Sequence, residues 1–278
     1  NSHEIILLEN IRFFHGEEKN QMHFARRLSQ WGDWYVNEAF AACHRAHAAV
    51  ALLPRLMPSY AGVRLEEEIE VLSGVMKRPK RPFVAILGGA KMETKLPLIR
   101  MLIKKADWML MAGALANTLL FLKGCAIGKS TADRHIIKDR EHISLFRKKI
   151  IMLPSDLIVA ARLRQSARSR ITTCRKIAQN EFIADIGPQT IRQFSSIIRR
   201  AGTIIWNGPL GYAEIPQFAH STARIAQAVS RSGAFSVVGG GDTIAALQRL
   251  RLLKGFTHIS TGGGAMLAFL AGEKLPGI

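Results

Sequence analysis

The segment FSVVGGGDTIAALQRLRLL, residues 235–253, decides the fold of this chain. It opens with apolar residues, passes through the three glycines Gly239–Gly241, and then meets Asp242 and Thr243. Apolar residues follow at helical spacing, at Ile244, Leu247, Leu250 and Leu253. The pattern predicts a buried strand, a glycine turn and a helix that is capped by Asp242 or Thr243.

A glycine turn of this kind lets backbone N–H groups approach a phosphate closely. The start of the following helix adds the positive end of its dipole. The Asp242 carboxylate beside such a turn has two interpretations: it either caps the helix or organises a complex between a metal and a nucleotide. The segment alone does not distinguish a structural turn from a phosphate site.

The same pattern recurs along the chain. Apolar segments end in glycines at Gly88, Gly113, Gly208, Gly239 and Gly262, and a helix or a polar loop follows each one. In open parallel sheets the ligand lies at the carboxyl ends of the strands. We therefore expect these turns to meet at one cleft that is rich in backbone donors and able to hold the phosphates of a nucleotide.

Two lysines follow the first of these turns, in the segment GGAKMETK at residues 88–95. Lys91 and Lys95 are four residues apart, which predicts that they share one face of a helix. The helix dipole disfavours cations at a helix N-terminus, so this pair has little structural purpose. The spacing favours a polyanion held between the two lysines.

The composition sets the outer limits. The 278 residues are 48% hydrophobic and 22% charged, which suits one large core or two modest ones. Apolar runs stay well below membrane-spanning length and no signal peptide opens the chain, so we expect no membrane partner. Three cysteines without a CxxC motif indicate reduced thiols and a cytoplasmic location.

The net charge of +18 implies attraction to anions, which include phosphorylated metabolites, nucleotides and nucleic acids. Nine lysines and arginines between Arg147 and Lys176 face a single acidic residue, Asp156. This run is either a nucleic-acid surface or a solvated, variable surface. Because no aromatic residues are interleaved for base stacking, we favour the solvated surface and expect only non-specific contact with nucleic acid.

The first third of the chain predicts a strand at Ile5–Leu8, a helix at Asn20–Trp31 and a short strand at Trp34–Val36. The last of these leads to CHRAH at residues 43–47. Two histidines around Arg45 suggest a metal, but zinc needs further ligands at a recognisable spacing. An anion site with Arg45 as the donor is favoured over a plain surface loop.

An amphipathic helix is predicted at Leu65–Met76, with four glutamates away from its apolar face. Prolines bracket it on both sides, at Pro54 and Pro58 and at Pro79 and Pro82. That arrangement is typical of a helix that connects two domains.

Seven blocks carry a resemblance in a fixed order along the chain. They are LLENIRF, YVNEAFAACHRAH, LGGAKMETK, DIGP, WNGPLGYAE, VVGGGDT and STGGGA, beginning at residues 7, 35, 87, 185, 206, 237 and 260. Together they resemble the phosphoglycerate kinase family. The resemblance implies an α/β fold of two doubly wound, Rossmann-like parallel-sheet lobes joined by a helix. It also implies a glycolytic kinase that transfers a phosphoryl group between 1,3-bisphosphoglycerate and Mg-ADP, giving 3-phosphoglycerate and ATP.

The resemblance also implies the roles of individual residues. Arg12 and Arg45 would hold the phosphoglycerate, and Lys91 and Lys95 would act on the transferred group. The nucleotide would contact a larger set, namely Lys95, Asn207, Glu214, Gly239, Gly240, Gly241, Asp242 and Thr243. Asp242 would also hold the Mg²⁺ that accompanies ATP or ADP. The implied protein is a cytoplasmic monomer.

The chain departs from the family at several points. It has no RxDxNxP motif, and roughly the first quarter of a family member is absent. Single departures are Glu38 for Asp, Ala41 for Gly, Ser221 for Gly, and Ala268 and Ala271 for glutamates. We therefore expect an incomplete N-terminal lobe and impaired activity of the chain as printed. The alternative is a non-catalytic relative that binds a nucleotide or RNA.

The expected division of the chain follows from the resemblance. Residues 1–60 would be the remnant of the N-terminal substrate lobe, and residues 61–78 the connector helix. Residues 79–260 would form the nucleotide-binding lobe, and residues 261–278 a C-terminal return segment.

Overall fold

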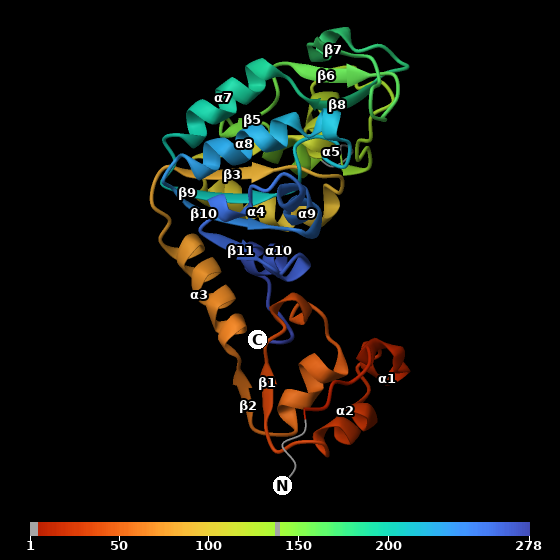
Figure 1. The fold of residues 1–278 in the computed structure, drawn as a ribbon, viewed down its shortest axis with the longest axis vertical. Coiled ribbons are helices and arrows are strands. Elements are labelled where there is room, and N and C mark those ends of the chain that lie inside the picture. Colours follow the sequence, from red (N-terminus) through yellow and green to blue (C-terminus); the bar gives the residue numbers. More distant parts are fainter. Residues whose placement is uncertain (1–4, 137–139) are drawn as a thin grey trace. The chain divides into compact units, whose positions relative to one another are not determined.

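A computed structural model describes residues 5–136 and 140–278 (Figure 1). The chain divides into two compact units. Unit 1 comprises Asn1–Glu70 together with Glu273–Ile278, and unit 2 comprises Val71–Gly272. Helix α3, Val63–Lys77, contains the boundary between them and confirms the helix predicted at Leu65–Met76.

A six-stranded parallel sheet forms the centre of unit 2, in the order β11-β10-β9-β3-β4-β5. Its strands are β3 (Phe83–Leu87), β4 (Trp108–Met111), β5 (Ile151–Met152), β9 (Thr203–Asn207), β10 (Phe235–Gly239) and β11 (His258–Ser260). The chain winds outward from β3 in one direction and outward from β9 in the other. The sheet is therefore doubly wound, as predicted, and its order switches between β3 and β9.

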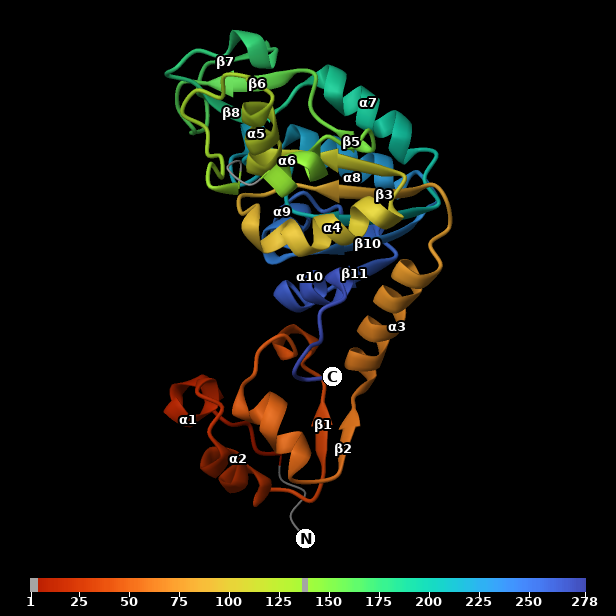
Figure 2. The same ribbon diagram turned by 180° about the vertical axis from the view of Figure 1, so that it is seen from behind.

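Helices cover both faces of this sheet. Their bounds are α4 (Leu96–Lys105), α5 (Gly113–Leu122), α6 (Arg140–Phe146), α7 (Pro188–Ile198), α8 (His220–Ser230), α9 (Gly241–Arg249) and α10 (Gly264–Ala271). Helices α7, α8 and α9 pack on one face through a continuous apolar cluster that includes Phe194, Ile225 and Trp206 (Figure 1). Helices α4 and α10 pack together on the other face (Figure 2). Because both faces are covered, every residue of β3 and β9 is buried.

A small antiparallel sheet in unit 2 has the order β7-β6-β8, with β6 at Leu157–Ala160, β7 at Ser169–Thr172 and β8 at Phe182–Ile186. Leu157 and Ile183 of this sheet pack with Leu120 of α5 in a second apolar cluster. The basic run found in the sequence lies mainly in the segments around this sheet, and only Arg170 of its nine basic residues lies in a strand, β7, which exposes three of its four residues.

Unit 1 contains the short helices α1 (His15–Glu18) and α2 (Met22–Ser29) and a two-stranded parallel sheet. The strands are β1 (Tyr35–Asn37) and β2 (Ser59–Ala61). These elements confirm the helix and the second strand predicted from the sequence. The C-terminal segment joins the unit, because the Gly277 N–H donates to the Cys43 carbonyl at 3.0 Å.

The strand predicted at Ile5–Leu8 is wrong. These four residues form no strand, and Ile5 and Leu7 are 99% and 94% exposed. The apolar run suggested a buried strand, but in the described part of unit 1 only β1 and β2 pair with one another. Without a neighbouring strand to pair with, the run stays irregular.

Candidate functional site

The turns that follow the strands of unit 2 are joined by backbone hydrogen bonds. The N–H groups of Gly88 and Gly89 donate to the carbonyls of Asn207 and Pro209, at 2.9 and 3.0 Å. The Ala114 N–H, at the start of α5, donates to the Gly89 carbonyl at 3.0 Å. The turns after β3, β4 and β9 therefore meet at the switch point of the sheet, as the recurring glycines predicted.

Two of these glycines are required by geometry. Gly208 has φ of +93°, and a Cβ there would lie 2.2 Å from the Gly88 carbonyl oxygen. Gly240 has φ of +97°, and a Cβ there would lie 2.8 Å from Nδ2 of Asn207. A side chain at either position would combine a strained backbone with a steric clash.

The turn between β10 and α9 is held by Asn207 and Thr243. Asn207 donates through Nδ2 to the Gly239 carbonyl at 3.0 Å, and Thr243 Oγ1 accepts from the Gly208 N–H at 2.7 Å. Both side chains are buried. Gly240 is the N-cap residue of α9, so the predicted capping by Asp242 or Thr243 is wrong. Asp242 lies in the first turn of the helix and its side chain is exposed.

A cavity of about 340 Å³ opens above these turns. It is lined by the first residues of two helices, Gly241–Thr243 of α9 and Gly263–Gly264 at the start of α10. Lys91, Lys95 and Asn207 line it as well. Helix N-termini present unpaired N–H groups and a positive dipole end, so the cavity has the properties of an anion site.

Lys95 is the buried cation of this cavity, with only 8% of the residue exposed. Burial lowers the pKa of its ammonium group, and the nearby negative charge of Asp242 opposes that shift. Lys91 is exposed. The prediction that both lysines share one helical face is wrong, because Lys95 ends a 3₁₀ turn at Glu93–Lys95 and α4 begins only at Leu96.

A second, mostly apolar pocket of about 130 Å³ adjoins the cavity. The two share Gly89, Ala90, Pro209 and Asp242. Its walls come from α5, β8 and the segment after β9, and Glu214 lines it with an exposed side chain. The pocket and the cavity therefore adjoin one another, the first with a mostly apolar lining and the second lined by two helix N-termini and Lys95.

The structure adds two residues to this pocket that the sequence did not single out, Asn117 and Asp185. Burial raises the pKa of Asp185 to about 7. The carboxylate accepts hydrogen bonds from the backbone N–H groups of Ser221 and Ile186, at 3.0 and 2.9 Å, and from the Ser221 hydroxyl. The departure from the family glycine at Ser221 was the available signal for this contact.

Unit 1 brings the two predicted substrate arginines near one histidine. Arg12 lies in a 3₁₀ turn at Ile11–Phe13, and both Arg12 and Arg45 are exposed. Burial lowers the pKa of His44, and the positive charges of Arg45 and Arg12 lower it further. This part of unit 1 is therefore a basic cluster. Among the described residues, no group of three or more His, Cys, Asp or Glu side chains could hold a metal ion.

Comparison with known proteins agrees with this architecture. A model of the phosphoglycerate kinase family matches residues 1–273. The chain is 42% identical over 280 residues to the phosphoglycerate kinase of Bdellovibrio bacteriovorus, covering 99% of this chain and 70% of that protein. It is 44% identical over 274 residues to the phosphoglycerate kinase of Rubrobacter xylanophilus, with the same coverage.

Solved structures agree as well. The phosphoglycerate kinase of Coxiella burnetii superposes with a TM-score of 0.88 at 39% identity, covering 97% of this chain and 70% of that one. The enzyme of Pyrococcus horikoshii gives a TM-score of 0.83 at 32% identity, covering 96% and 70%. The resemblance carried by the seven sequence blocks is thereby confirmed. The chain belongs to the phosphoglycerate kinase family.

Proposed function

We propose that this protein is a glycolytic phosphoglycerate kinase that transfers a phosphoryl group reversibly between 1,3-bisphosphoglycerate and ADP, giving 3-phosphoglycerate and ATP. The observation that carries the proposal is the buried Lys95 in a cavity formed by two helix N-termini at the switch point of the sheet. Phosphoryl transfer needs little covalent chemistry from the protein. It needs positioning, and positive charge where negative charge spreads in the transition state.

The adjoining pocket and cavity suit the two ends of a nucleotide. The purine base would occupy the apolar pocket, and the exposed carboxylate of Glu214 at that pocket would contact the ribose. The phosphates would lie over Gly239–Thr243, where the turn and the start of α9 offer backbone donors. Asn207 would contribute by fixing this turn through its hydrogen bond to the Gly239 carbonyl.

Asp242 fits the role of a magnesium ligand. Protein sites commonly hold Mg²⁺ through one or two carboxylates together with substrate phosphates. The Asp242 carboxylate lies in the first turn of α9 and lines the anion-binding cavity, so it offers one such ligand beside the expected phosphates. A bound Mg²⁺ would neutralise charge on the nucleotide phosphates.

The cations have distinct parts in the proposed reaction. Lys95, held in place by burial, would stabilise charge on the transferred group, and the exposed Lys91 would reach the same phosphates from the rim of the cavity. Arg12 and Arg45 of unit 1 would bind the phosphoglycerate, which is supported by the positive charge that both place near His44. Fork-shaped guanidinium groups match carboxylate and phosphate oxygens.

We also propose which residue ranges form each lobe. Residues 1–60 belong to a substrate lobe, residues 61–78 form the connector helix, residues 79–260 form a nucleotide lobe, and residues 261–278 are a return segment of which only Glu273–Ile278 rejoin unit 1. The hydrogen bonds of Gly277 to Cys43 and Asn37 support the last assignment, since all three residues lie in unit 1. We also propose a monomer in the cytoplasm. Light scattering of the purified protein tests the oligomeric state. Among the helices of the described residues, none has the length and hydrophobicity of a membrane span.

Calorimetry with Mg-ADP tests the proposed site directly. We expect binding by the 278-residue chain, a strong loss with Lys95→Met, and a smaller loss with Lys91→Met because Lys91 is exposed. Asp242→Asn should weaken binding chiefly when magnesium is present, so the variant and the parent should converge in EDTA. Absence of binding at millimolar Mg-ADP would refute the proposed function. ATP formation from 1,3-bisphosphoglycerate then tests the second substrate.

A further inference from the structure

Two of the three cysteines lie side by side in unit 2. Cys125 follows the C-terminal end of α5, and its N–H donates to the Leu120 carbonyl at 3.0 Å. Cys174 begins the 3₁₀ turn Cys174–Lys176 after β7. Both side chains pack against the apolar cluster that α5 shares with the small antiparallel sheet, and the two thiols share a hydrogen bond. The fold thus brings together two thiols that are far apart in the sequence.

Backbone hydrogen bonds hold the segments that carry this contact. The Lys129 N–H donates to the Glu181 carbonyl at 2.8 Å, and the Ile183 N–H donates to the Ser130 hydroxyl at 2.7 Å. These bonds fix the segment after the first cysteine against the segment that runs from the second cysteine into β8. The thiol contact is therefore part of the folded structure of unit 2.

The third cysteine provides a contrast. Cys43 of unit 1 is fully buried and accepts a hydrogen bond from Nδ2 of Asn37. Cys125 and Cys174 are both partly exposed. Oxidation of cysteines is selective for accessible thiols, and an oxidised thiol beside a second one ends as a disulfide. Oxidation of this chain should therefore be concentrated at the pair in unit 2.

The surroundings give the two thiols different roles. Burial, followed by the interaction with Cys174, raises the pKa of Cys125 to about 11. The positive charges of Arg175 and Lys123 oppose this shift. Cys125 keeps its proton at neutral pH, and the thiolate is the form that attacks an oxidant. Cys125 therefore suits the role of the second, resolving thiol, and the first attack falls to Cys174.

We propose that Cys125 and Cys174 form a reversible disulfide when the protein meets hydrogen peroxide, so that the pair is a redox modification site. Sγ of Cys174 attacks one peroxide oxygen, the O–O bond breaks, and the products are a sulfenic acid and a water molecule. Sγ of Cys125 then attacks the oxidised sulfur, the S–O bond breaks, and the departing hydroxide takes the Cys125 proton to become a second water. The two thiols lose two electrons and two protons, and the peroxide gains them. The inference goes beyond the proposed function and does not depend on it.

Mass spectrometry of the full chain tests the proposal. Protein purified in reducing buffer and treated with one equivalent of hydrogen peroxide should lose the mass of two hydrogen atoms and remain a single chain. Peptide mapping without reduction should recover Cys125 and Cys174 in one cross-linked pair of peptides and Cys43 as a free thiol. Dithiothreitol should reverse the cross-link. Because the link closes a loop of about 50 residues in the unfolded chain, oxidation should raise the melting temperature by about 5 °C or more.

Serine variants separate the roles of the two thiols. Cys125→Ser should leave Cys174 as a sulfenic acid, which dimedone traps. Cys174→Ser should react with peroxide at least about tenfold more slowly than the parent, because the remaining thiol of the pair stays protonated. Cys43→Ser is the matched control, and it should form the cross-link as the parent does.

The parent protein alone can overturn the proposal, without any variant that must fold. If peroxide yields only separate sulfenic or sulfinic acids, or only links between chains, the two thiols do not react with one another and the proposal is wrong. If the cross-link forms but the melting temperature falls, the disulfide fits only a distorted structure, and the proposal is wrong as well.

Discussion

Both units contain parallel strands, but the strands are buried in unit 2 and largely exposed in unit 1. In unit 2, β3 and β9 are buried along their whole length because helices cover both faces of the sheet. In unit 1, β1 and β2 form a two-stranded sheet in which β2 is exposed at all three positions. Parallel strands are stable mainly where both faces are covered. The comparison indicates that most of the fold's stability, and the proposed nucleotide site, reside in unit 2.

The units also differ in charge. The chain has 39 lysines and arginines and 21 acidic residues. Unit 1 holds eight of the basic and eleven of the acidic residues, whereas unit 2 holds 31 basic and ten acidic residues. Unit 1 is therefore weakly acidic, and the positive charge of the protein belongs entirely to unit 2. A basic unit attracts anions over its surface, and the cavity lined by Lys95 is where we propose that a specific anion, the nucleotide phosphates, binds.

The largest expected difference in the free energy of unfolding is between variants of two tryptophans, one in each unit. Trp206 is fully buried in unit 2, and its Nε1–H donates to the Gly208 carbonyl at 2.8 Å. Trp34 of unit 1 is 73% exposed. Trp206→Ala should lower the free energy of unfolding by about 3 to 5 kcal/mol, and Trp34→Ala by less than about 1 kcal/mol. Urea unfolding followed by circular dichroism measures both. Equal losses would contradict the assignment of stability to unit 2.

A smaller effect is expected from a pair of glycines within unit 2. Gly208→Ala would place a Cβ 2.2 Å from the Gly88 carbonyl oxygen at a φ of +93°. The substitution should lower the free energy of unfolding by about 2 to 4 kcal/mol, because it strains the backbone and overpacks the turn. It should also weaken ADP binding, because the turn after β9 must shift. Gly74→Ala is the control. A Cβ at Gly74 meets no atom of the described residues within 4 Å, so the change should stabilise α3 by about 0.5 to 1 kcal/mol.

The sequence predicted the meeting of the glycine turns of unit 2 well, for a physical reason. Strand, glycine turn and helix are local patterns, and the carboxyl ends of parallel strands meet at one edge of a sheet. The recurring turns at Gly88, Gly208 and Gly239 therefore sufficed to predict where Lys95 and Asp242 would gather. The roles of these residues, and of Arg12 and Arg45, remain proposals that binding measurements must test.

Other features could not be predicted because they depend on distant partners. The burial of Asp185 depends on packing in three dimensions, and two of the three hydrogen bonds that its carboxylate accepts come from Ser221, 36 residues away. Asn117 is a single amide in a largely apolar helix, and its sequence neighbours do not reveal that Oδ1 lacks a hydrogen-bond partner among the described residues. The strand predicted at Ile5–Leu8 was wrong for a related reason. A strand pattern in the sequence does not reveal whether another strand is present to pair with it.

The Asp185–Ser221 contact gives a pH-dependent prediction for unit 2. The pKa of Asp185 is about 7 in the folded protein, against 3.8 for an exposed aspartate. The folded state therefore binds the proton more tightly, so the contribution of Asp185 to stability is fully present below about pH 4 and is lost as the pH rises through 7. The Ser221 hydroxyl, which donates to this carboxylate, offsets part of the loss by stabilising the charged form.

Ser221→Ala should therefore cost more stability at pH 8 than at pH 5. Hydrogen bonds to charged groups contribute about 1.5 to 3 kcal/mol and neutral ones about 0.5 to 1.5 kcal/mol, so we expect losses of about 2 and about 1 kcal/mol. Thermal unfolding of the parent and the variant at both pH values measures the difference. A loss that does not change with pH would show that Asp185 keeps one protonation state across this range.

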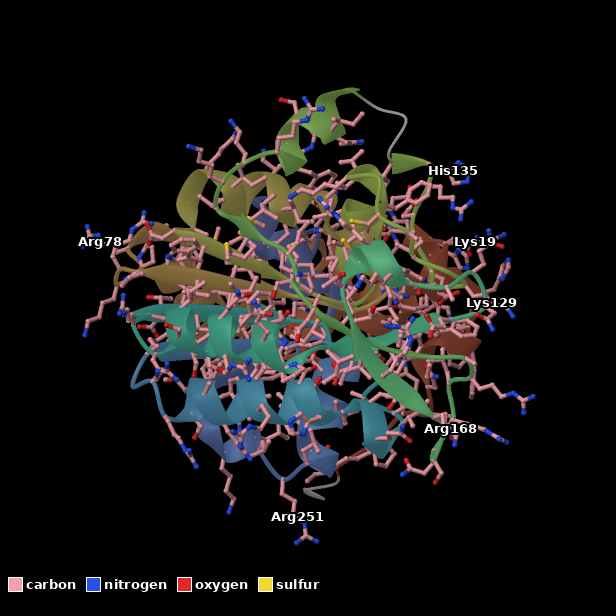
Figure 3. The ribbon with its side chains drawn as sticks, turned by 90° about the horizontal axis from the view of Figure 1, so that it is seen from above. Lys19, Arg78, Lys129, His135, Arg168 and Arg251 are labelled. Atoms are coloured by element: carbon pink, nitrogen blue, oxygen red, sulfur yellow. The ribbon has the colours of Figure 1, made fainter. Side chains whose placement is uncertain are left out.

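The smallest effect concerns the charge difference between the units. Arg162, Arg164 and Arg168 are exposed in unit 2, and Arg168 points away from the protein (Figure 3). Replacing all three by glutamine should change the free energy of unfolding by less than about 0.5 kcal/mol per site. Binding of single-stranded DNA should fall, and because each lost phosphate contact reduces the dependence of log K on log salt by about 0.7, the slope should decrease by about 2.

The matched control lies in the acidic unit, where Arg26, Arg27 and Arg55 are also exposed. Their replacement by glutamine removes the same charge from the chain but leaves the basic surface of unit 2 intact, so the salt dependence should not change. If both triple variants reduce the slope equally, net charge alone governs the binding, and the units do not differ in this respect. If the parent forms a sequence-selective complex that survives high salt, base-specific contacts are present and the basic run is more than a solvated surface.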